Sequence, residues 1–433
     1  MKGRLNLFQA AMLRWRGMYP YNAVHVAELP GTLDEARLSR AVDDHLTELG
    51  ITRLRLDVAR RRYEYAGGPA HAPLPVFDAH GNALQVLERE MERHINEPFG
   101  PAAGETEFEP LRFFAVRNGG SFHVAVAYDH FIAGGDSMVT MLQGIAARYD
   151  GTYPAHQPPP NLYPQAYARL FARNALAFYV GQYLLPGMLL RSRRAVRPRY
   201  PHGDSKYNAF TSIEFAPEVY GVVRRTAKQW GVTLNDMLLA MLICALSAEV
   251  PDRLSAKRRR EIAIASVINL RSELEPGTRE VFGQFLSSFL VSHLVPPGAS
   301  LETLARDVHA QTQRVKRRKL YLQTLYLLAC GGLAWRFMTP EQHKQMYAKN
   351  YPVWGGLSAL NVEAMWKEGV GDAPVLHYLR AISTGPFSPL VLAPASVGDC
   401  LHVGVSWRTS AFTRADIDRI TASMQSCARK LAA

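Results

Sequence analysis

The stretch "FHVAVAYDHFIAGGDSM", residues 122–138, has the alternating pattern of a buried strand that ends in a histidine and runs into two glycines. In a strand of period two, every second residue from Phe122 to Tyr128 shares one face, and His130 falls in line with that set. A histidine there can be tightly packed and still reach a cleft, and its ordinary pKa near neutrality suits a general base. The residues alone predict either a catalytic base or a structural histidine before a flexible turn.

On both sides of this stretch, strands and helices intermingle without a strict repeat. Residues 22–29 and 110–118 alternate like strands, and residues 32–46 and 83–95 have the spacing of amphipathic helices. This order predicts an α/β protein, in the α+β sense of mixed sheets.

The clearest break lies between residues 153 and 204, where a proline-rich run is followed by a basic, loop-like run. Beyond it the same mixture of strands and helices begins again. We therefore predict an N-terminal lobe, residues 1–200, that carries the histidine stretch, and a C-terminal lobe, residues 201–433.

The 433 residues are 48% hydrophobic and 20% charged, as in an ordinary globular protein. Lys plus Arg exceed Asp plus Glu by 50 − 38 = 12, so the surface attracts acidic partners: nucleic acid, anionic lipid, a phosphorylated cofactor or an acidic protein. The basic clusters are scattered and belong to no recognition module, which argues against nucleic acid.

The four cysteines lie far apart and outside any Cys-x-x-Cys pair, which predicts neither a zinc site nor a disulfide framework, and we expect no metal. The first twenty residues fail as a secretory signal because Gln9, Arg14 and Arg16 interrupt their apolar run. We expect a cytoplasmic monomer.

Two apolar segments, residues 174–190 and 320–338, lie beside clusters of arginine and lysine. Each is short or interrupted for a membrane span. The sequence predicts buried helices for both, with peripheral docking on an anionic lipid surface as the alternative.

Within the opening stretch, "DHFIAGGDS" resembles the His-His-x-x-x-Asp-Gly signature of nonribosomal-peptide condensation domains and of the wider chloramphenicol-acetyltransferase-like, CoA-dependent acyltransferase superfamily. His130 matches the second, catalytic histidine, and Gly135 matches the glycine. Asp129 replaces the first histidine, and Gly134 occupies the place of the family aspartate.

Further segments resemble the family in its own order along the chain. They are the opening strand and helix "NAVHVAELPGTLDEARLSRAVDDHL", the helix "GVTLNDMLLAMLICAL", the strand end "VINLRSE", the crossing segment "VFGQFLSSFLV" and the strand "GLSALNVE". The resemblance implies two similar lobes in a V, a tunnel between them, and a histidine that deprotonates or orients an acceptor hydroxyl or amine attacking a thioester.

In the family, the aspartate pairs with an arginine that closes the base of the site, and Arg271 is the natural candidate for that arginine. An arginine buried without a carboxylate is costly. We expect Asp136 to turn back to Arg271 on the pliable loop at Gly134 and Gly135, with Glu273 or Asp129 as the less favoured partners. Further residues expected to line the tunnel are Ser287, Ser288, Ser358 and Asn361.

The predicted function is transfer of an acyl group from a CoA or acyl-carrier-protein thioester to a small hydroxyl or amine acceptor, in natural-product biosynthesis. We expect an enzyme that stands alone without an attached carrier domain, holds no permanently bound cofactor, and uses acyl-CoA or a phosphopantetheinyl carrier as co-substrate. The alternative is a degenerate domain that serves as a docking platform for a carrier protein or another enzyme.

Overall fold

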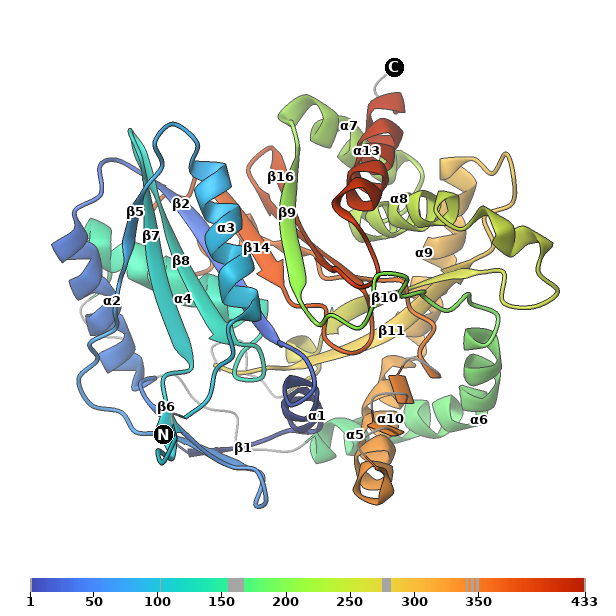
Figure 1. The fold of residues 1–433 in the computed structure, drawn as a ribbon, viewed down its shortest axis with the longest axis horizontal. Helices are drawn as coiled ribbons and strands as arrows, with labels where there is room; N and C mark the ends of the chain where they lie inside the picture. Colours follow the sequence, from blue (N-terminus) through green and yellow to red (C-terminus); the bar gives the residue numbers. More distant parts are fainter. Residues whose placement is uncertain are drawn as a thin grey trace.

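The computed structural model describes residues 2–101, 103–154, 167–274, 282–339, 342–343, 346–347 and 350–431. Within these residues the chain forms two large mixed sheets that lie beside each other, flanked by helices (Figure 1). The mixed α/β fold predicted from the sequence is therefore confirmed.

The first sheet holds the histidine stretch in its middle. Its strand order is β14-β2-β8-β7-β5. The strands are β14 (His377–Ile382), β2 (Asn22–Pro30), β8 (Ser121–Asp129), β7 (Leu111–Asn118) and β5 (Val76–Asp78). Every residue of β8 is buried, because neighbouring strands pair with both of its edges and helices cover both faces.

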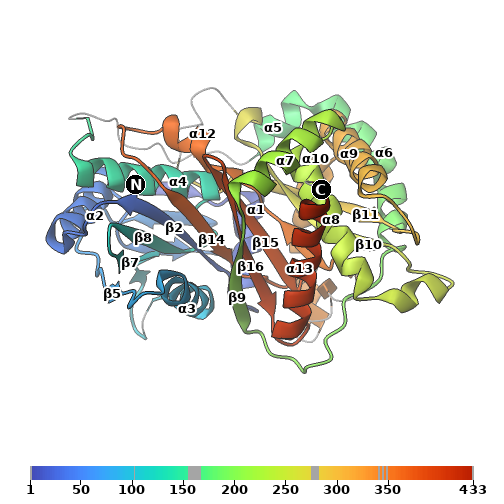
Figure 2. The same ribbon diagram turned by 90° about the horizontal axis from the view of Figure 1, so that it is seen from above.

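Helices α2 (Glu35–Leu49) and α4 (Gly135–Asp150) pack together on one face of this sheet, and α3 (Ala83–Asn96) covers the other (Figure 2). The apolar spacing of α2 buries Leu38, Val42 and Leu46, and Gly50 ends the helix in the left-handed conformation at φ 64°. Only residues 130–134 separate the end of β8 from the start of α4, so the strand and the helix hold both ends of this short loop.

The second sheet has the strand order β11-β10-β12-β15-β16-β9, with β13 also paired to β15. Its strands are β9 (Asn208–Phe215), β10 (Ile262–Asn269), β11 (Leu286–His293), β12 (Gly355–Leu357), β13 (Leu360–Asn361), β15 (Leu390–Val397) and β16 (Cys400–Arg408). The surrounding helices are α7 (Pro217–Gln229), α8 (Leu234–Ala248), α9 (Leu301–Arg317), α12 (Val362–Lys367) and α13 (Arg414–Lys430).

A small sheet and several short elements complete the described fold. The small sheet has the order β1-β4-β3-β6, with β1 (Lys2–Arg4), β4 (Arg62–Tyr65), β3 (Leu54–Asp57) and β6 (Glu107–Phe108). The remaining helices are α1 (Leu7–Arg16), α5 (Ala168–Arg173), α6 (Ala175–Ser192), α10 (Tyr321–Ala334), and the short 3-10 turns η1 (Pro251–Ser255), η2 (Arg271–Glu273) and η4 (Trp335–Phe337).

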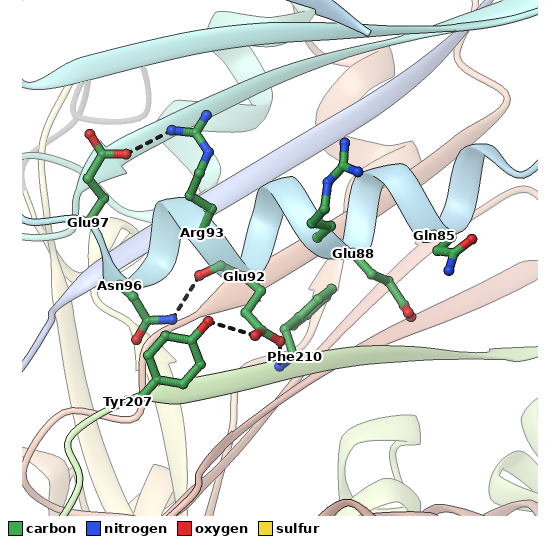
Figure 3. A pocket seen from close by; sticks show the side chains of 9 residues that line it. Gln85, Glu88, Glu92, Arg93, Asn96, Glu97, Tyr207 and Phe210 are labelled. Carbon is green, nitrogen blue, oxygen red and sulfur yellow. Dashed lines mark hydrogen bonds and ion pairs between the residues drawn. The ribbon is translucent and has the colours of Figure 1, made fainter. Parts of the chain in front are cut away.

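Two connections tie the halves of the chain together. Strand β14 comes from the C-terminal half yet pairs with β2 in the first sheet, in the register Arg380 to His25. Helix α3 covers the free edge of β9, where Glu92 and Glu88 accept hydrogen bonds from the backbone N–H groups of Phe210 (2.8 Å) and Ser212 (2.6 Å) (Figure 3). Unpaired strand edges are thereby satisfied. The division near residue 200 stays a prediction.

The two apolar segments form the helices α6 and α10, as predicted, but the expected burial of the first is wrong. Of the residues in α6, only Gly181 is buried, and in α10 the buried residues lie in its first half. Among the described residues, no single helix is long and apolar enough to cross a membrane, and only the pair α7 and α8, bent by 105°, meets the criteria jointly.

Candidate active site

His130 is held between the two halves of the chain at the end of β8. Its backbone N–H donates to the carbonyl of Tyr21 (3.2 Å), and its carbonyl accepts from the side-chain amide of Gln284 (3.1 Å). The imidazole is 8% exposed and packs near the rings of Tyr21 and Tyr128, each with centroids 5.6 Å away. It lines a cavity of about 1050 Å³.

The imidazole of His130 is kept neutral by its surroundings. Burial lowers the pKa of His130 to about 3, the positive charge of Arg380 adds to this effect, and the backbone of Ala133 opposes it. Among the described residues, Nδ1 of His130 is buried without a hydrogen-bond partner. A neutral imidazole beside a cavity is able to accept a proton from a molecule bound there.

The glycines after His130 are required by close contacts rather than by unusual backbone angles. A Cβ atom on Gly134 would lie 2.6 Å from Oδ1 of Asp136 and 2.9 Å from Oε1 of Gln284. A Cβ atom on Gly135 would lie 2.7 Å from the Leu360 side chain and 3.1 Å from Nη2 of Arg380. The space that a side chain would need at position 134 is therefore occupied by the carboxylate of Asp136.

Asp136 forms an ion pair with Arg271, the partner that the sequence led us to expect. The Arg271 guanidinium is 8% exposed and also donates to Oγ of Ser137 (2.6 Å) and to the carbonyl of Gly283 (3.1 Å). The side-chain amide of Asn269 donates to the same carboxylate oxygen of Asp136, Oδ2 (2.9 Å). Sequence reasoning did not find Ser137 or Asn269.

The two less favoured carboxylates are engaged elsewhere. Glu273 accepts from Nζ of Lys319 (2.6 Å) and from the hydroxyl of Tyr321 (3.0 Å). Asp129 is fully buried and forms an ion pair with Arg16 of α1. Burial raises the pKa of Asp129 to about 6, and Arg16 opposes this. Asp129 thus ties α1 to the end of β8 and is not a partner of Arg271.

The four residues expected to line the tunnel divide into two groups. Ser288 and Ser358 line the cavity. Ser287 points to the other face of β11 and donates to the carbonyl of Tyr321 (2.8 Å), because successive residues of a strand face opposite sides. The exposed Asn361 caps α12 by accepting from the N–H of Ala364 (3.2 Å). The expectation for Ser287 and Asn361 is not met.

Sequence reasoning missed Arg380, which lines the cavity and is 2% exposed. Its guanidinium donates to the carbonyl of Ser358 (2.8 Å) and lies 3.4 Å from Nε2 of His25, whose Nδ1 is 2.8 Å from the hydroxyl of Tyr378. Burial lowers the pKa of Arg380. The sequence did contain a signal for Arg380, because a charged residue interrupts the apolar run "YLRAI". However, the position of Arg380 at the cavity depends on the pairing of β14 with β2.

The cavity extends from His130 along the second sheet, beneath helices α6 and α10. Its walls include small and apolar residues of β10 and apolar residues of α6, and its lining also holds arginines: Arg191, Arg193, Arg197, Arg259 and Arg314. Burial lowers the pKa of Arg259, and the positive charges of Arg197 and Arg193 add to this effect. The cavity therefore offers an apolar channel with a cationic region.

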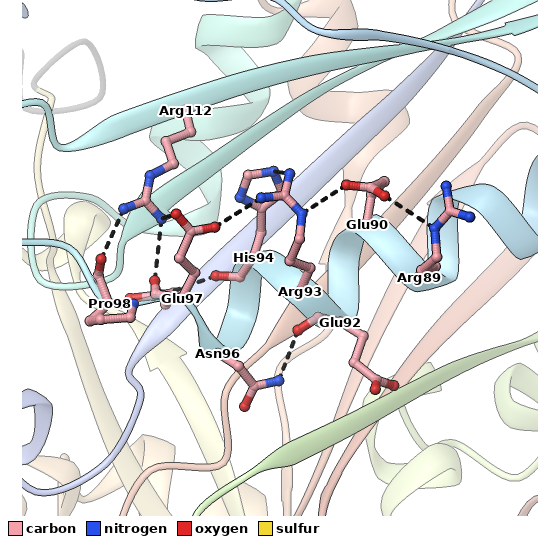
Figure 4. Close-up of polar contacts among 10 residues, drawn as sticks. Arg89, Glu90, Glu92, Arg93, His94, Asn96, Glu97, Pro98 and Arg112 are labelled. Carbon is pink, nitrogen blue, oxygen red and sulfur yellow. Dashed lines mark hydrogen bonds and ion pairs between the residues drawn. The ribbon is translucent and has the colours of Figure 1, made fainter.

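A second cavity, of about 740 Å³, lies between α3 and β9 (Figure 3). The charged residues along α3 bind one another: Arg93 donates to Glu90 and to Glu97 at 2.9 Å each (Figure 4). The charged side chains that line this cavity therefore already bind either the edge of β9 or one another along α3. Among the described residues, no group of three or more His, Cys, Asp or Glu side chains could hold a metal ion.

We expect acid to destabilise the fold through its buried histidines. Burial lowers the pKa of His45, His94 and His130 to about 3, and that of His25 well below its ordinary value. Below pH 6.5 these histidines bind protons in the unfolded chain and stay neutral in the folded chain. The free energy of unfolding therefore falls by about 1.4 kcal/mol per pH unit for each histidine. Asp129 acts in the opposite direction, because its raised pKa means that the folded chain binds its proton first. Between pH 6 and 4 it therefore cancels the effect of about one of the four histidines.

Urea unfolding at pH 7 and pH 5 measures this loss. In the variant His130→Gln, the fall in the free energy of unfolding should be smaller by the contribution of one histidine, about 1.4 kcal/mol per pH unit. A free energy of unfolding that is the same at both pH values would contradict the buried, neutral state of these rings.

Comparison with known proteins shows the fold. No family model matches the sequence, and no curated protein matches it significantly. Among solved structures, the first condensation domain of the calcium-dependent antibiotic synthetase, solved with a substrate analogue, has a TM-score of 0.69 at 16% identity, covering 100% of this chain and 98% of that one.

Two further structures have the same fold. The starter condensation domain of rhizomide synthetase, a mutant solved with C8-CoA, has a TM-score of 0.69 at 14% identity, covering 100% of this chain and 95% of that one. The SgcC5 protein from Streptomyces globisporus has a TM-score of 0.66 at 14% identity, covering 99% and 98%. The chain has the condensation-domain fold, and the resemblance predicted from its motifs is confirmed at the level of fold.

Proposed function

We propose that the protein is an acyltransferase of the condensation-domain type, which moves an acyl group from a thioester to the hydroxyl or amine of a small acceptor. The observation that carries this proposal is the position of the His130 imidazole, which lines a cavity at the place where both halves of the chain hold its backbone. The donor is acyl-CoA or an acyl carrier protein, used as a co-substrate with no permanently bound cofactor. One structure of the same fold was solved with C8-CoA.

The proposed reaction transfers the acyl group directly. His130 accepts the proton of the acceptor O–H or N–H as the oxygen or nitrogen attacks the thioester carbonyl carbon. The carbon–sulfur bond then breaks, and the departing thiolate takes the proton back from the imidazolium, so the histidine returns to its neutral form. A thioester is already activated, so the placing of the two reactants and the movement of one proton supply most of the acceleration.

Arg380 has a role in this proposal because its charge lies in the same cavity. The cation lowers the pKa of His130 in the empty site and so disfavours the imidazolium. When the thioester carbonyl oxygen gains negative charge, the guanidinium stabilises that oxygen, and the new negative charge offsets its effect on the imidazolium. The carbonyl of Ser358 and the ring of His25 hold the guanidinium in place.

The rest of the cavity fits the two parts of an acyl thioester. Its apolar walls beneath α6 and α10 suit an acyl chain, and the arginines in its lining suit the phosphates of CoA or of a phosphopantetheinyl arm. An acidic carrier protein would also be attracted to a chain with a net charge of +12. The protein is proposed to act as a cytoplasmic monomer.

Incubation with acyl-CoA of graded chain length and with a panel of alcohols and amines tests the proposal. We expect release of free thiol that depends on the acceptor, and a product whose mass equals acceptor plus acyl group. Binding of a carrier protein without any thiol release, for every donor and acceptor, would overturn the proposal and favour a docking platform.

A further inference from the structure

Helices α6 and α10 expose more large apolar side chains than the rest of the described surface. The two helices contact each other, through Phe178 and Tyr326 among others, and lie at the lower right of Figure 1. Nine of the thirteen exposed large hydrophobic residues belong to this region, which we call the α6–α10 face: Leu176, Tyr179, Val180, Tyr183, Leu189, Leu190, Tyr326, Leu333 and Phe337.

The exposure of this face is large as well as concentrated. Tyr183 is 86% exposed, Phe337 83% and Leu176 80%. A surface helix normally has an apolar stripe toward the core and a polar face toward water, but α6 is apolar on all sides and buries only Gly181. Exposed apolar side chains gathered on two adjoining helices are typical of interaction sites.

The two segments that form the face carry charge of a single sign. Residues 168–194 and 320–338 contain no Asp or Glu. They contain arginines at both ends of α6 and just after α10: Arg169, Arg173, Arg191, Arg193, Arg194 and Arg336. Apolar and tyrosine side chains with arginines at the margin are the composition of a surface that lies on an anionic bilayer.

The position of α6 relates this face to the candidate active site. Leu184, Leu185 and Met188 line the cavity that holds His130, while Tyr183 and Leu190 on the same helix face outward. A bilayer in contact with the outer side of α6 would therefore lie one helix away from the cavity. This arrangement suits apolar molecules that move between a lipid phase and the cavity.

We propose that the α6–α10 face is a docking surface for the anionic lipid headgroups and upper acyl chains of a membrane, on which the protein lies without crossing it. A lipid surface fits better than a protein partner because the face combines all-round apolar side chains with cations alone. A protein partner of standard kind would also be met by mixed charges at the rim. This proposal does not depend on the proposed function.

Co-sedimentation of the full chain with vesicles tests this surface. We expect binding to phosphatidylcholine vesicles with about a third phosphatidylglycerol to be at least about tenfold tighter than to phosphatidylcholine alone, and to weaken as salt is raised. The apolar arm uses Leu176→Ser, Tyr183→Ser and Phe337→Ser together, and its matched control changes exposed residues elsewhere: Val58→Ser, Leu84→Ser and Leu376→Ser.

We expect the apolar variant to lose about tenfold or more in partition onto anionic vesicles and the control to bind like the unaltered chain. The charge arm compares Arg173→Gln/Arg194→Gln/Arg336→Gln, which lie outside the cavity lining, with Arg224→Gln/Arg225→Gln/Lys228→Gln on α7, which lies at the top of Figure 1 and away from α6. Only the first set should abolish the preference for anionic lipid.

The side chains changed in the apolar arm are exposed, so folding should be kept, and urea unfolding of each variant checks this. Absence of vesicle binding, or equal loss in variant and control, would overturn the proposal. Self-association that the apolar variant abolishes, without vesicle binding, would also overturn it and would assign the face to a second copy of the chain.

Discussion

The variant Gly134→Asp, which introduces the aspartate that the motif resemblance would place there, is expected to destabilise the fold by several kcal/mol. The new Cβ would lie 2.6 Å from Oδ1 of Asp136 and 2.9 Å from Oε1 of Gln284, and the new carboxylate would add a like charge beside the first. The single variant Asp136→Ala should also cost about 3–5 kcal/mol, because Arg271 would be left buried without its carboxylate.

The double variant Gly134→Asp/Asp136→Ala should recover most of the stability that each single variant loses. In the double variant the clash with Asp136 is gone, and a carboxylate again lies near Arg271. The contact with Oε1 of Gln284 remains in the double variant, but this oxygen has no hydrogen-bond partner among the described residues, so a shift of it breaks no hydrogen bond at that atom. The glycine at position 134 is therefore explained by the Asp136 carboxylate, which fills the space that a side chain there would need and pairs with Arg271.

Urea unfolding of the four proteins measures the coupling between positions 134 and 136. We expect the double variant to be more stable than the sum of the single effects by at least about 2 kcal/mol. The control Gly120→Asp, at a turn where an added Cβ meets nothing within 4 Å, should be nearly neutral. Purely additive effects would show that the two positions do not share one carboxylate site.

The variant His130→Ala is expected to lower acceptor-dependent acyl transfer by about 10²- to 10⁴-fold, the usual contribution of a general base. The change removes the imidazole that lines the cavity and leaves the backbone contacts to Tyr21 and Gln284 in place. Thiol release at saturating donor and acceptor is the measurement.

The matched control is His45→Ala. His45 is as buried as His130 and its pKa is likewise lowered to about 3, but it lies on α2 against Gly144 and outside the cavity lining. Both variants should lose stability, and only His130→Ala should lose turnover in the fraction that remains folded. Turnover of His130→Ala within about tenfold of the unaltered enzyme would remove His130 from the proposed role.

The local parts of the site could be predicted from the sequence. Period two along residues 122–130 placed His130 at the strand end, because the alternation of a strand depends only on the order of its residues. The pairing of Asp136 with Arg271 is not local, and its prediction came from the family resemblance, which supplied the arginine, together with the cost of a buried guanidinium without a carboxylate.

The parts that depend on long-range pairing could not be predicted. Arg380 reaches the cavity only because β14 leaves the second half of the chain and pairs with β2, a register that no local pattern specifies. The choice between Ser287 and Ser288 depended on the side that β11 turns to the cavity. The apolar pattern of residues 174–190 predicted the helix α6 correctly but did not predict that most of its side chains are exposed. A buried helix and a helix that lies on lipid have the same apolar composition, so the pattern cannot separate them.

Intact-mass analysis of a single turnover tests the central claim most directly. The protein is mixed in excess with one acyl-CoA and one acceptor that together gave a product, and the reaction is quenched over time. Direct transfer governed by His130 predicts that the acyl mass passes from CoA to the acceptor and never appears on the protein, and that His130→Ala leaves the acyl group on CoA. A protein adduct that forms and decays at the rate of turnover would contradict the account.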